Sequence, residues 1–225
     1  MDHPKKQTPD YGNWVSNRLF YITGGLSLLF TALCVVSPFF LLGTILFMGC
    51  LVYFMYARQK FSPQGGNLQA RIRDLVLEHL DWDGHGEALD IGCGNAPLTI
   101  SLAKKYRESK VIGMDYWGSG WDYSQETCEA NTVIEGVSKQ IRFEKASASN
   151  LPYTDGRFDA VVSNFVFHEV ADCKDKRTLV KEALRILKKG GAFAFQDLFL
   201  VEKIYGDMDA FLEGIKSWGV RSAAL

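Results

Sequence analysis

The residues most able to do chemistry lie in one short segment, ALDIGCGNAPLTI, residues 88–100. An apolar run there contains Asp90 and is followed by Gly92-Cys93-Gly94-Asn95. Two glycines at this spacing allow a tight turn and a close approach of a ligand to the backbone, because neither carries a Cβ. A carboxylate just before such a turn attracts a cation and repels a phosphate. The segment therefore predicts a ligand site with a positive charge near Asp90.

A second acidic residue, Asp115, lies 21 residues beyond Gly94, at the end of another apolar run. A carboxylate in that place can accept hydrogen bonds from both hydroxyls of a ribose. A nicotinamide dinucleotide uses the same elements, but its G-x-G-x-x-G fingerprint needs a third glycine where Pro97 stands. Pro97 and the charge of Asp90 together argue against a dehydrogenase.

The elements that must position these residues alternate along the chain between apolar strands and helices. Helices are predicted at 97–106, 124–135, 175–187 and 208–218, and strands at 88–91, 111–115, 141–144, 159–163 and 192–195. This alternation predicts an α/β fold with a mostly parallel sheet covered on both faces. Ligands in such sheets bind at the carboxyl ends of the strands, which is where the glycine turn falls.

Residues 67–199 resemble the class I S-adenosylmethionine (SAM)-dependent methyltransferases. The resemblance rests on the glycine motif at 90–94, on Asp115, on the sequence NLPY at 150–153 followed by FDAVV at 158–162, and on EALRILKKGG at 182–191. It implies a Rossmann-like, doubly wound sheet, SAM as the cofactor and transfer of a methyl group.

The resemblance also implies which residues hold SAM. Asp90 and Gly92 are expected at its amino-acid end, Asp115 at the ribose and Tyr116 at the adenine. The full set of expected cofactor-binding residues is Asp90, Gly92, Cys93, Gly94, Asn95, Asp115, Tyr116, Ser147, Ala148 and Asn164.

This sequence departs from the family at the adenine. Ser147, followed by Ala148, stands where the family commonly has an acidic residue that binds the adenine amino group. A hydroxyl accepts that hydrogen bond more weakly than a carboxylate. Asn164, at the end of the fourth strand, is expected to face the methyl donor.

Methyl transfer from a sulfonium needs no nucleophile from the protein, because the acceptor itself attacks the methyl group and alignment supplies much of the rate. A base helps if the acceptor is a hydroxyl, an acidic carbon or a protonated amine. His168 and Glu169, just past Asn164, are the available catalytic candidates, although a histidine there can also serve packing alone. The five cysteines form no CxxC pair, so no metal site is predicted.

The N-terminal part differs from the rest, because residues 20–56 contain no Asp, Glu, Lys or Arg. A run of this length exceeds one crossing of a bilayer, whose core is about 30 Å thick. Ser37-Pro38 lies near its middle, so we expect two transmembrane helices at 20–36 and 39–56. A signal peptide has a shorter apolar core, and a buried hairpin of a soluble fold usually keeps a polar face.

The expected domains are a cytoplasmic segment at 1–18, the two transmembrane helices within 19–57, a linker at 58–66 and the methyltransferase domain at 67–225. Positive residues flank both ends of the apolar run, namely Lys5, Lys6, Arg18, Arg58 and Lys60. Because such residues favour the cytoplasmic side, the catalytic domain is expected there.

The membrane address favours a small-molecule or lipid-like methyl acceptor. The near-even balance of 25 basic and 26 acidic residues gives no indication of nucleic-acid binding. Only 26 residues follow Phe199, fewer than the family's last helix and two strands need, so the sheet is expected to lack one or two strands or the chain to be a truncated member. An alternative function therefore stays open, a SAM-binding membrane protein without turnover.

Overall fold

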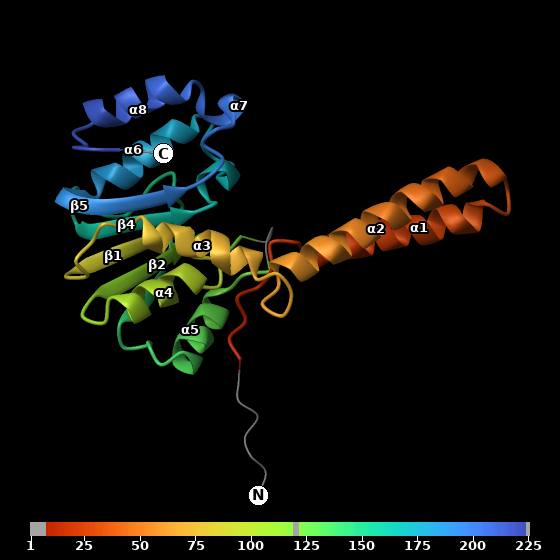
Figure 1. Ribbon diagram of the computed structural model, residues 1–225, viewed down its shortest axis with the longest axis horizontal. Coiled ribbons are helices and arrows are strands. Elements are labelled where there is room, and N and C mark those ends of the chain that lie inside the picture. Colours follow the sequence, from red (N-terminus) through yellow and green to blue (C-terminus); the bar gives the residue numbers. More distant parts are fainter. Residues whose placement is uncertain (1–7, 119–121, 224–225) are drawn as a thin grey trace, which may run out of the picture. The chain divides into compact units, whose positions relative to one another are not determined.

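The computed structural model describes residues 8–118 and 122–223, and these fall into two compact units (Figure 1). We call residues 12–72 the hairpin unit. The sheet unit contains residues 8–11, 73–118 and 123–223. Each unit is described by itself, and Lys5 and Lys6, on which the expected orientation partly rests, lie outside the described residues.

The sheet unit is built on five parallel strands in the order β3-β2-β1-β4-β5 (Figure 1). The strands are β1 (Glu87–Ile91), β2 (Lys110–Asp115), β3 (Ile141–Lys145), β4 (Phe158–Asn164) and β5 (Leu187–Gln196). The chain winds outward from β1 to β3 and then returns to place β4 on the other side of β1. The direction of winding therefore switches between β1 and β4, which confirms the predicted Rossmann-like parallel sheet.

Helices cover both faces of this sheet (Figure 1). One apolar core joins the sheet to α3 (Leu68–Glu78), α4 (Pro97–Lys105) and α5 (Gln125–Ile134). The other joins it to α6 (Lys176–Arg185), α7 (Glu202–Tyr205) and α8 (Met208–Ser217). Alternate residues of β1 supply the two cores, with Ala88 in the first and Leu89 and Ile91 in the second. This alternation is the two-residue period of a strand that is buried on both sides.

The fifth strand begins earlier than the sequence predicted, at Leu187 rather than Ala192. Leu187 pairs with Phe158 and Ala192 pairs with Ala160, so the register shifts over the polar residues between them. Gly190 has a φ of +83° in this irregular stretch. The predicted helix at 175–187 is correspondingly shorter, with Asp175 capping α6 through a hydrogen bond from the Arg177 amide at 3.1 Å.

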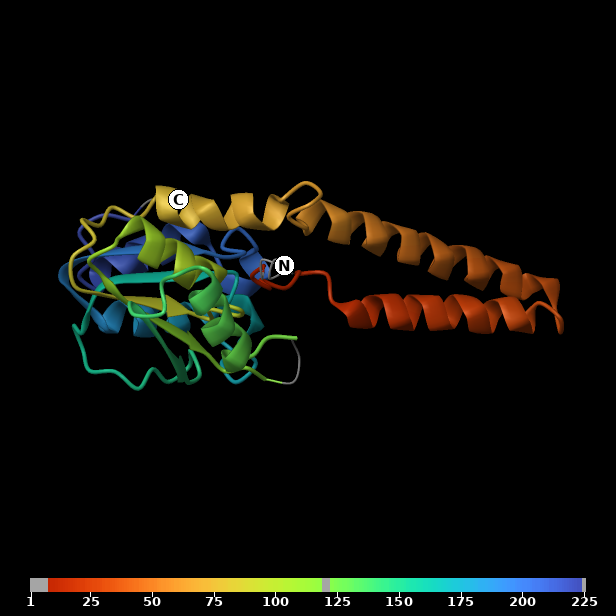
Figure 2. The ribbon, with the colours of Figure 1, turned by 90° about the horizontal axis from the view of Figure 1, so that it is seen from below.

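The hairpin unit consists of two helices, α1 (Asn17–Leu33) and α2 (Leu41–Phe61), which lie side by side and antiparallel (Figures 1 and 2). The helices approach closely at Gly43, where an added Cβ would lie 2.2 Å from the Phe30 ring. Pro38 does not lie in the middle of the turn. It opens the short 3₁₀ helix η1 (Pro38–Phe40) that leads into α2, a first-turn position where proline loses no hydrogen bond.

Among the described residues, one helix is long and apolar enough to cross a membrane by length and composition. It runs from Pro38 to Phe61, and none of its most apolar window is buried. α1 has 17 residues and is shorter. Its large apolar side chains are also exposed, for example Tyr21 and Leu28.

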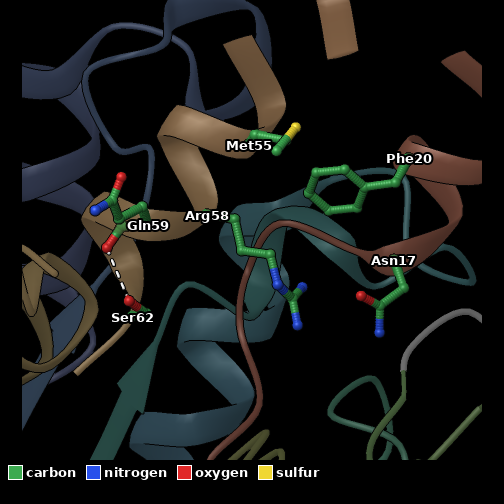
Figure 3. Close-up of a pocket in the computed structure, with 6 residues that line it drawn as sticks. All are labelled: Asn17, Phe20, Met55, Arg58, Gln59 and Ser62. Carbon is green, nitrogen blue, oxygen red and sulfur yellow. Dashed lines mark hydrogen bonds between the residues drawn. The ribbon is translucent and has the colours of Figure 1, made fainter. Parts of the chain in front are cut away.

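The open end of the hairpin carries polar as well as apolar side chains (Figure 3). A hollow there is lined by Asn17, Phe20, Met55, Arg58, Gln59 and Ser62. The Arg58 guanidinium donates to the Val15 carbonyl at 2.7 Å and lies 5.8 Å from the centre of the Phe20 ring. The apolar and the basic parts of the hairpin are thus separated along its length.

Candidate functional site

The turn after β1 is held against the end of β2 by backbone hydrogen bonds. The Gly92 and Cys93 amides both donate to the Met114 carbonyl, at 2.7 and 3.0 Å. Gly92 has a φ of +73° and Gly94 a φ of +57°, a conformation that favours glycine. A Cβ on Gly92 would come within 2.2 Å of the Val166 side chain, so the segment after β4 lies directly on this turn.

Asp90 is a buried carboxylate at the end of β1. Its Oδ2 accepts a hydrogen bond from the Thr99 hydroxyl of α4 at 2.6 Å. Burial raises the pKa of Asp90 to about 7, the Thr99 hydrogen bond opposes the rise, and the charge of Asp115 adds to it. A cation that entered beside Asp90 would therefore ionise it and release its proton.

Asp115 binds the turn from the end of β2. One carboxylate oxygen accepts from the Gly94 amide and the other from the Trp117 amide, both at 2.8 Å. The Trp117 indole donates back to the Gly94 carbonyl at 3.0 Å. Burial raises the pKa of Asp115, and these amide hydrogen bonds limit the rise. Each carboxylate oxygen can accept a further hydrogen bond, so Asp115 keeps acceptor sites for hydroxyl groups.

Two residues predicted to bind the cofactor have buried side chains that hold the turn in place. The Asn95 amide oxygen accepts from the Ser124 amide at 3.2 Å, and the Asn95 carbonyl accepts from the Asn131 side chain at 3.0 Å. Cys93 is buried beside Cys128, whose thiol donates to the Gly94 carbonyl at 3.0 Å. Burial raises the pKa of the Cys93 thiol, so it stays uncharged.

The predicted adenine side lies along β2 and β3. Tyr116 follows Asp115 and is 65% exposed, with the Lys145 ammonium 5.8 Å from its ring centre. Ala148 is buried in the core beside α6. The Ala146 amide donates to the Asp115 backbone carbonyl at 3.1 Å. The loop that follows β3 therefore starts beside Asp115.

Ser147 has a neighbour that the sequence did not indicate. Its hydroxyl lies 2.8 Å from the Ser149 hydroxyl and donates to Asp172 at 3.2 Å, while Ser149 donates to the same Asp172 oxygen at 2.6 Å. A carboxylate from the segment after β4 thus lies beside the serine that replaces the family's acid.

Asn164 and Gln196 end the neighbouring strands β4 and β5 and are paired in register. The side-chain oxygens Asn164 Oδ1 and Gln196 Oε1 are buried and have no hydrogen-bond partner among the described residues. Asp90 lies on the same face of the sheet, because it pairs with Val162, two residues before Asn164. Buried acceptors without a donor are costly, so a ligand that carries N–H or O–H groups would be favoured at this edge of the sheet.

His168 and Glu169, the predicted catalytic candidates, lie on the 3₁₀ helix η2 (Phe167–Glu169) that follows β4. The His168 Nδ1 lies 2.6 Å from Asp197 Oδ1, and Nε2 lies 3.3 Å from Glu169 Oε1. The hydrogen bond to Asp197 raises the pKa of His168, burial opposes the rise, and the charges of Asp197 and Glu169 support it.

Sequence reasoning missed four residues that shape this edge, namely Thr99, Val166, Gln196 and Asp197. Val166 and Gln196 carry no signal in the sequence, because Gly92 and Asn164, which they meet, lie far away along the chain. Thr99 lies only nine residues from its partner Asp90, but a threonine on a helix does not by itself indicate such a contact. Asp197 did carry one. It directly follows β5, much as Asp115 is the last residue of β2, and an acidic residue at such a strand end is a signal for a site residue.

In comparison with known proteins, the chain resembles methyltransferases. Residues 89–195 match the model of a family described as a methyltransferase domain, and they run from the middle of β1 into β5. Residues 89–195 are therefore similar to methyltransferase domains.

The relatives of this chain include a protein of Lactobacillus johnsonii named demethylmenaquinone methyltransferase. It is 35% identical over 105 residues, which are 46% of this chain and 40% of that protein. The Bacillus subtilis protein of the same name is 32% identical over 121 residues, 53% of this chain and 48% of that protein. This chain therefore spans less than half the length of these two relatives.

Among solved structures, geranyl diphosphate C-methyltransferase from Streptomyces coelicolor is similar with a TM-score of 0.49 and 18% identity. The match covers 58% of this chain and 46% of that one. That structure contains S-adenosyl-L-homocysteine.

We predict that the two glycines of the turn differ in what they tolerate. Gly92→Ala should lower the free energy of unfolding by about 3 kcal/mol, because it combines a positive φ with a clash against Val166. Gly94→Ala should cost only about 1 kcal/mol, since its nearest neighbour would lie at 3.5 Å. Urea unfolding of the two variants measures the difference, and equal losses would contradict this account of the turn.

Proposed function

We propose that this chain transfers a methyl group from SAM to a lipid-like acceptor at a membrane. SAM as the methyl donor is supported mainly by the buried Asp90 carboxylate beside the glycine turn. Two buried amide oxygens that accept no hydrogen bond lie on the same face of the sheet. The ammonium of a methionine supplies both a positive charge and N–H donors, which suits this set of groups. A pyrophosphate supplies neither.

The proposed contacts follow the geometry of the strand ends. Asp90 and Asn164 bind the amino-acid end of the donor, with the Gly92–Gly94 backbone beneath it. Asp115 accepts from the ribose hydroxyls, as its remaining acceptor sites allow. Tyr116 and the loop of Ser147 and Ala148 bind the adenine. The bound donor supplies an activated methyl on a sulfonium, and the chain's residues supply alignment.

The hairpin unit supports a membrane location. A helix of the soluble core would bury its apolar window, whereas the window within 38–61 is not buried at all. α1 pairs with it and also exposes large apolar side chains, so we propose that both helices cross the bilayer. Arg18, Arg58 and Lys60 lie at the open end of the pair, which favours the cytoplasmic side for that end.

A membrane location concentrates acceptors that are dissolved in the bilayer. The two bacterial relatives are named for demethylmenaquinone, so a lipid-soluble quinone in its reduced, hydroquinone form is the first acceptor to test.

Transfer itself is tested by incubating the full chain with methyl-labelled SAM and membranes, followed by extraction and identification of labelled lipids. We expect the label to appear in a lipid-soluble small molecule. Label that stays entirely on SAM, although calorimetry shows SAM binding, would favour a SAM-binding membrane protein without turnover.

We predict that SAM affinity depends on the ionisation of Asp90. Because the pKa of Asp90 is raised to about 7, the free protein holds a proton there below pH 7, and an ammonium must displace it. Affinity should therefore rise roughly tenfold between pH 5.5 and 7.0, where the ligand's ammonium keeps its proton. Titration calorimetry in two buffers of different ionisation enthalpy should also show proton release.

Asp90→Asn is the matched variant, because it keeps the shape and the Thr99 contact but cannot ionise. It should bind SAM more weakly at pH 7 and show no rise in affinity over this pH range. Equal affinity of the parent chain at pH 5.5 and 7.0 would contradict a contact between Asp90 and the ammonium.

We predict that the hairpin holds the chain in the membrane against alkaline extraction. Replacing both Leu42 and Leu46 by Arg should release the chain into the supernatant, because charges in the bilayer core cost several kcal/mol. Both side chains are exposed, so the folding of the domain should be unaffected, and Leu200→Arg is the matched exposed control outside the hairpin. Release of the unmodified chain would contradict the anchor.

A further inference from the structure

We propose that His168, oriented by Asp197, removes a proton from an acidic O–H group of the methyl acceptor. This inference rests on the proposed function, because it names the chemical class of the acceptor for the same site. Asp197 is the new element, and it acts through His168 as a positioning residue.

The geometry fixes which ring nitrogen of neutral His168 carries the proton. The Nδ1–Oδ1 distance to Asp197 is 2.6 Å, and the His168 amide donates to the other oxygen of the same carboxylate at 3.3 Å. The Leu198 amide also donates to Asp197 Oδ1, at 2.6 Å. The carboxylate, which only accepts, keeps the imidazole proton on Nδ1 and leaves the lone pair of neutral His168 on Nε2.

The His168–Asp197 pair is more buried than an ordinary surface ion pair. The Asp197 side chain has no exposed surface, and that of His168 is 18% exposed. Such a carboxylate is held by donors on several sides, and it lies at the end of β5, the strand that pairs with β4. The imidazole is therefore fixed in one orientation, as a base acting on a bound substrate needs to be.

His168 lies on the same edge of the sheet as the glycine turn. Parallel strands end at one edge, and Val166, two residues before His168, contacts Gly92. The histidine thus follows immediately after the segment that covers the proposed SAM site. Phe165, with a φ of +56°, turns the chain between β4 and η2, and its ring lies edge-on to the imidazole with centres 6.2 Å apart.

Three charged groups lie around this histidine, and Tyr205 lies beside its partner Asp197. Asp197 from β5 and Glu169 from η2 favour the imidazolium, while Lys176 at the start of α6 disfavours it. Tyr205 of α7 is fully buried, and burial followed by the charge of Asp197 raises its pKa, so it stays a neutral phenol. Removing Asp197 therefore lowers the pKa of His168, because the largest stabilising contact of the imidazolium is lost.

The acceptor O–H bond breaks, its electron pair forms the bond to the methyl carbon, and the proton passes to His168 Nε2. The bonding pair of the sulfonium–methyl bond stays on sulfur. Glu169, 3.3 Å from Nε2, stabilises the imidazolium that results. An acceptor that needs no proton removal, such as a thiolate, would gain nothing from this arrangement.

The first test observes the pair without any acceptor. Nitrogen NMR of the full chain labelled at histidine, in lipid nanodiscs, should show neutral His168 protonated on Nδ1. Asp197→Asn should lower its titration midpoint by about one pH unit. The exposed His85 is the internal reference and should not move. A neutral His168 protonated on Nε2, or a midpoint that Asp197→Asn leaves unchanged, would overturn the pairing.

The second test is transfer of labelled methyl to the membrane lipid fraction as a function of pH. His168→Gln should lower kcat about 100-fold and leave the affinity for SAM within twofold of the parent. Asp197→Asn should move the rising limb of the pH profile to lower pH as well as lower its plateau. His85→Gln should match the parent chain.

Different outcomes would overturn the role of His168 and Asp197 and the proposed methyl transfer. Retention of the parent kcat by His168→Gln, or a loss with Asp197→Asn that is equal at all pH values, would overturn the role of the pair. Absence of transfer by the unmodified chain would instead overturn the proposed function on which the pair's role rests.

Discussion

The hydrogen bonds between the Gly92–Gly94 turn and the end of β2 are the constraint on which the rest of the site depends. The Met114 carbonyl accepts two amides of the turn, and the Asp115 carboxylate accepts a third from Gly94. These contacts bind the end of β1 to the end of β2 and allow the chain to enter α4 at once. The same turn leaves room for Val166 because Gly92 has no side chain. The position of the segment that carries Val166 and His168 thus depends on the absence of a Cβ at residue 92.

Three carboxylates lie at the strand ends of the candidate site, and each has a different set of hydrogen-bond donors. Asp90 is buried and accepts one hydrogen bond, from the Thr99 hydroxyl, so its pKa is raised and a bound cation would favour its ionised form. Asp115 accepts two amides and belongs partly to the structure of the turn. Asp197 accepts two amides and faces an imidazole. The proposed donor and acceptor sides therefore differ in what compensates the buried charge: a ligand in one case and a histidine in the other.

Much of this fold could be predicted from the sequence, because the information is local. Apolar runs that end in Asp90 and Asp115 indicated buried strands, and the two glycines indicated the turn between β1 and α4. The start of β5 was missed because Lys188, Lys189 and Gly190 look like a loop, yet they form an irregular part of the strand that pairing with β4 holds in place.

The site was predicted less completely, for a physical reason. The role of a residue at a strand end depends on partners from other strands. Asn95 was expected at the cofactor, but its side chain meets the amide of Ser124, 29 residues away in sequence. Asp197 meets His168 across the same separation of 29 residues. Such long-range contacts leave no pattern in a single sequence, whereas a glycine turn does.

The most direct test of the central claim is a crystal structure of the full chain with S-adenosyl-L-homocysteine. The account predicts that the amino acid of this ligand lies beside Asp90 and Asn164, with its ribose hydroxyls on Asp115. A ligand bound elsewhere on the domain, or bound there with its ammonium turned away from Asp90, would contradict it.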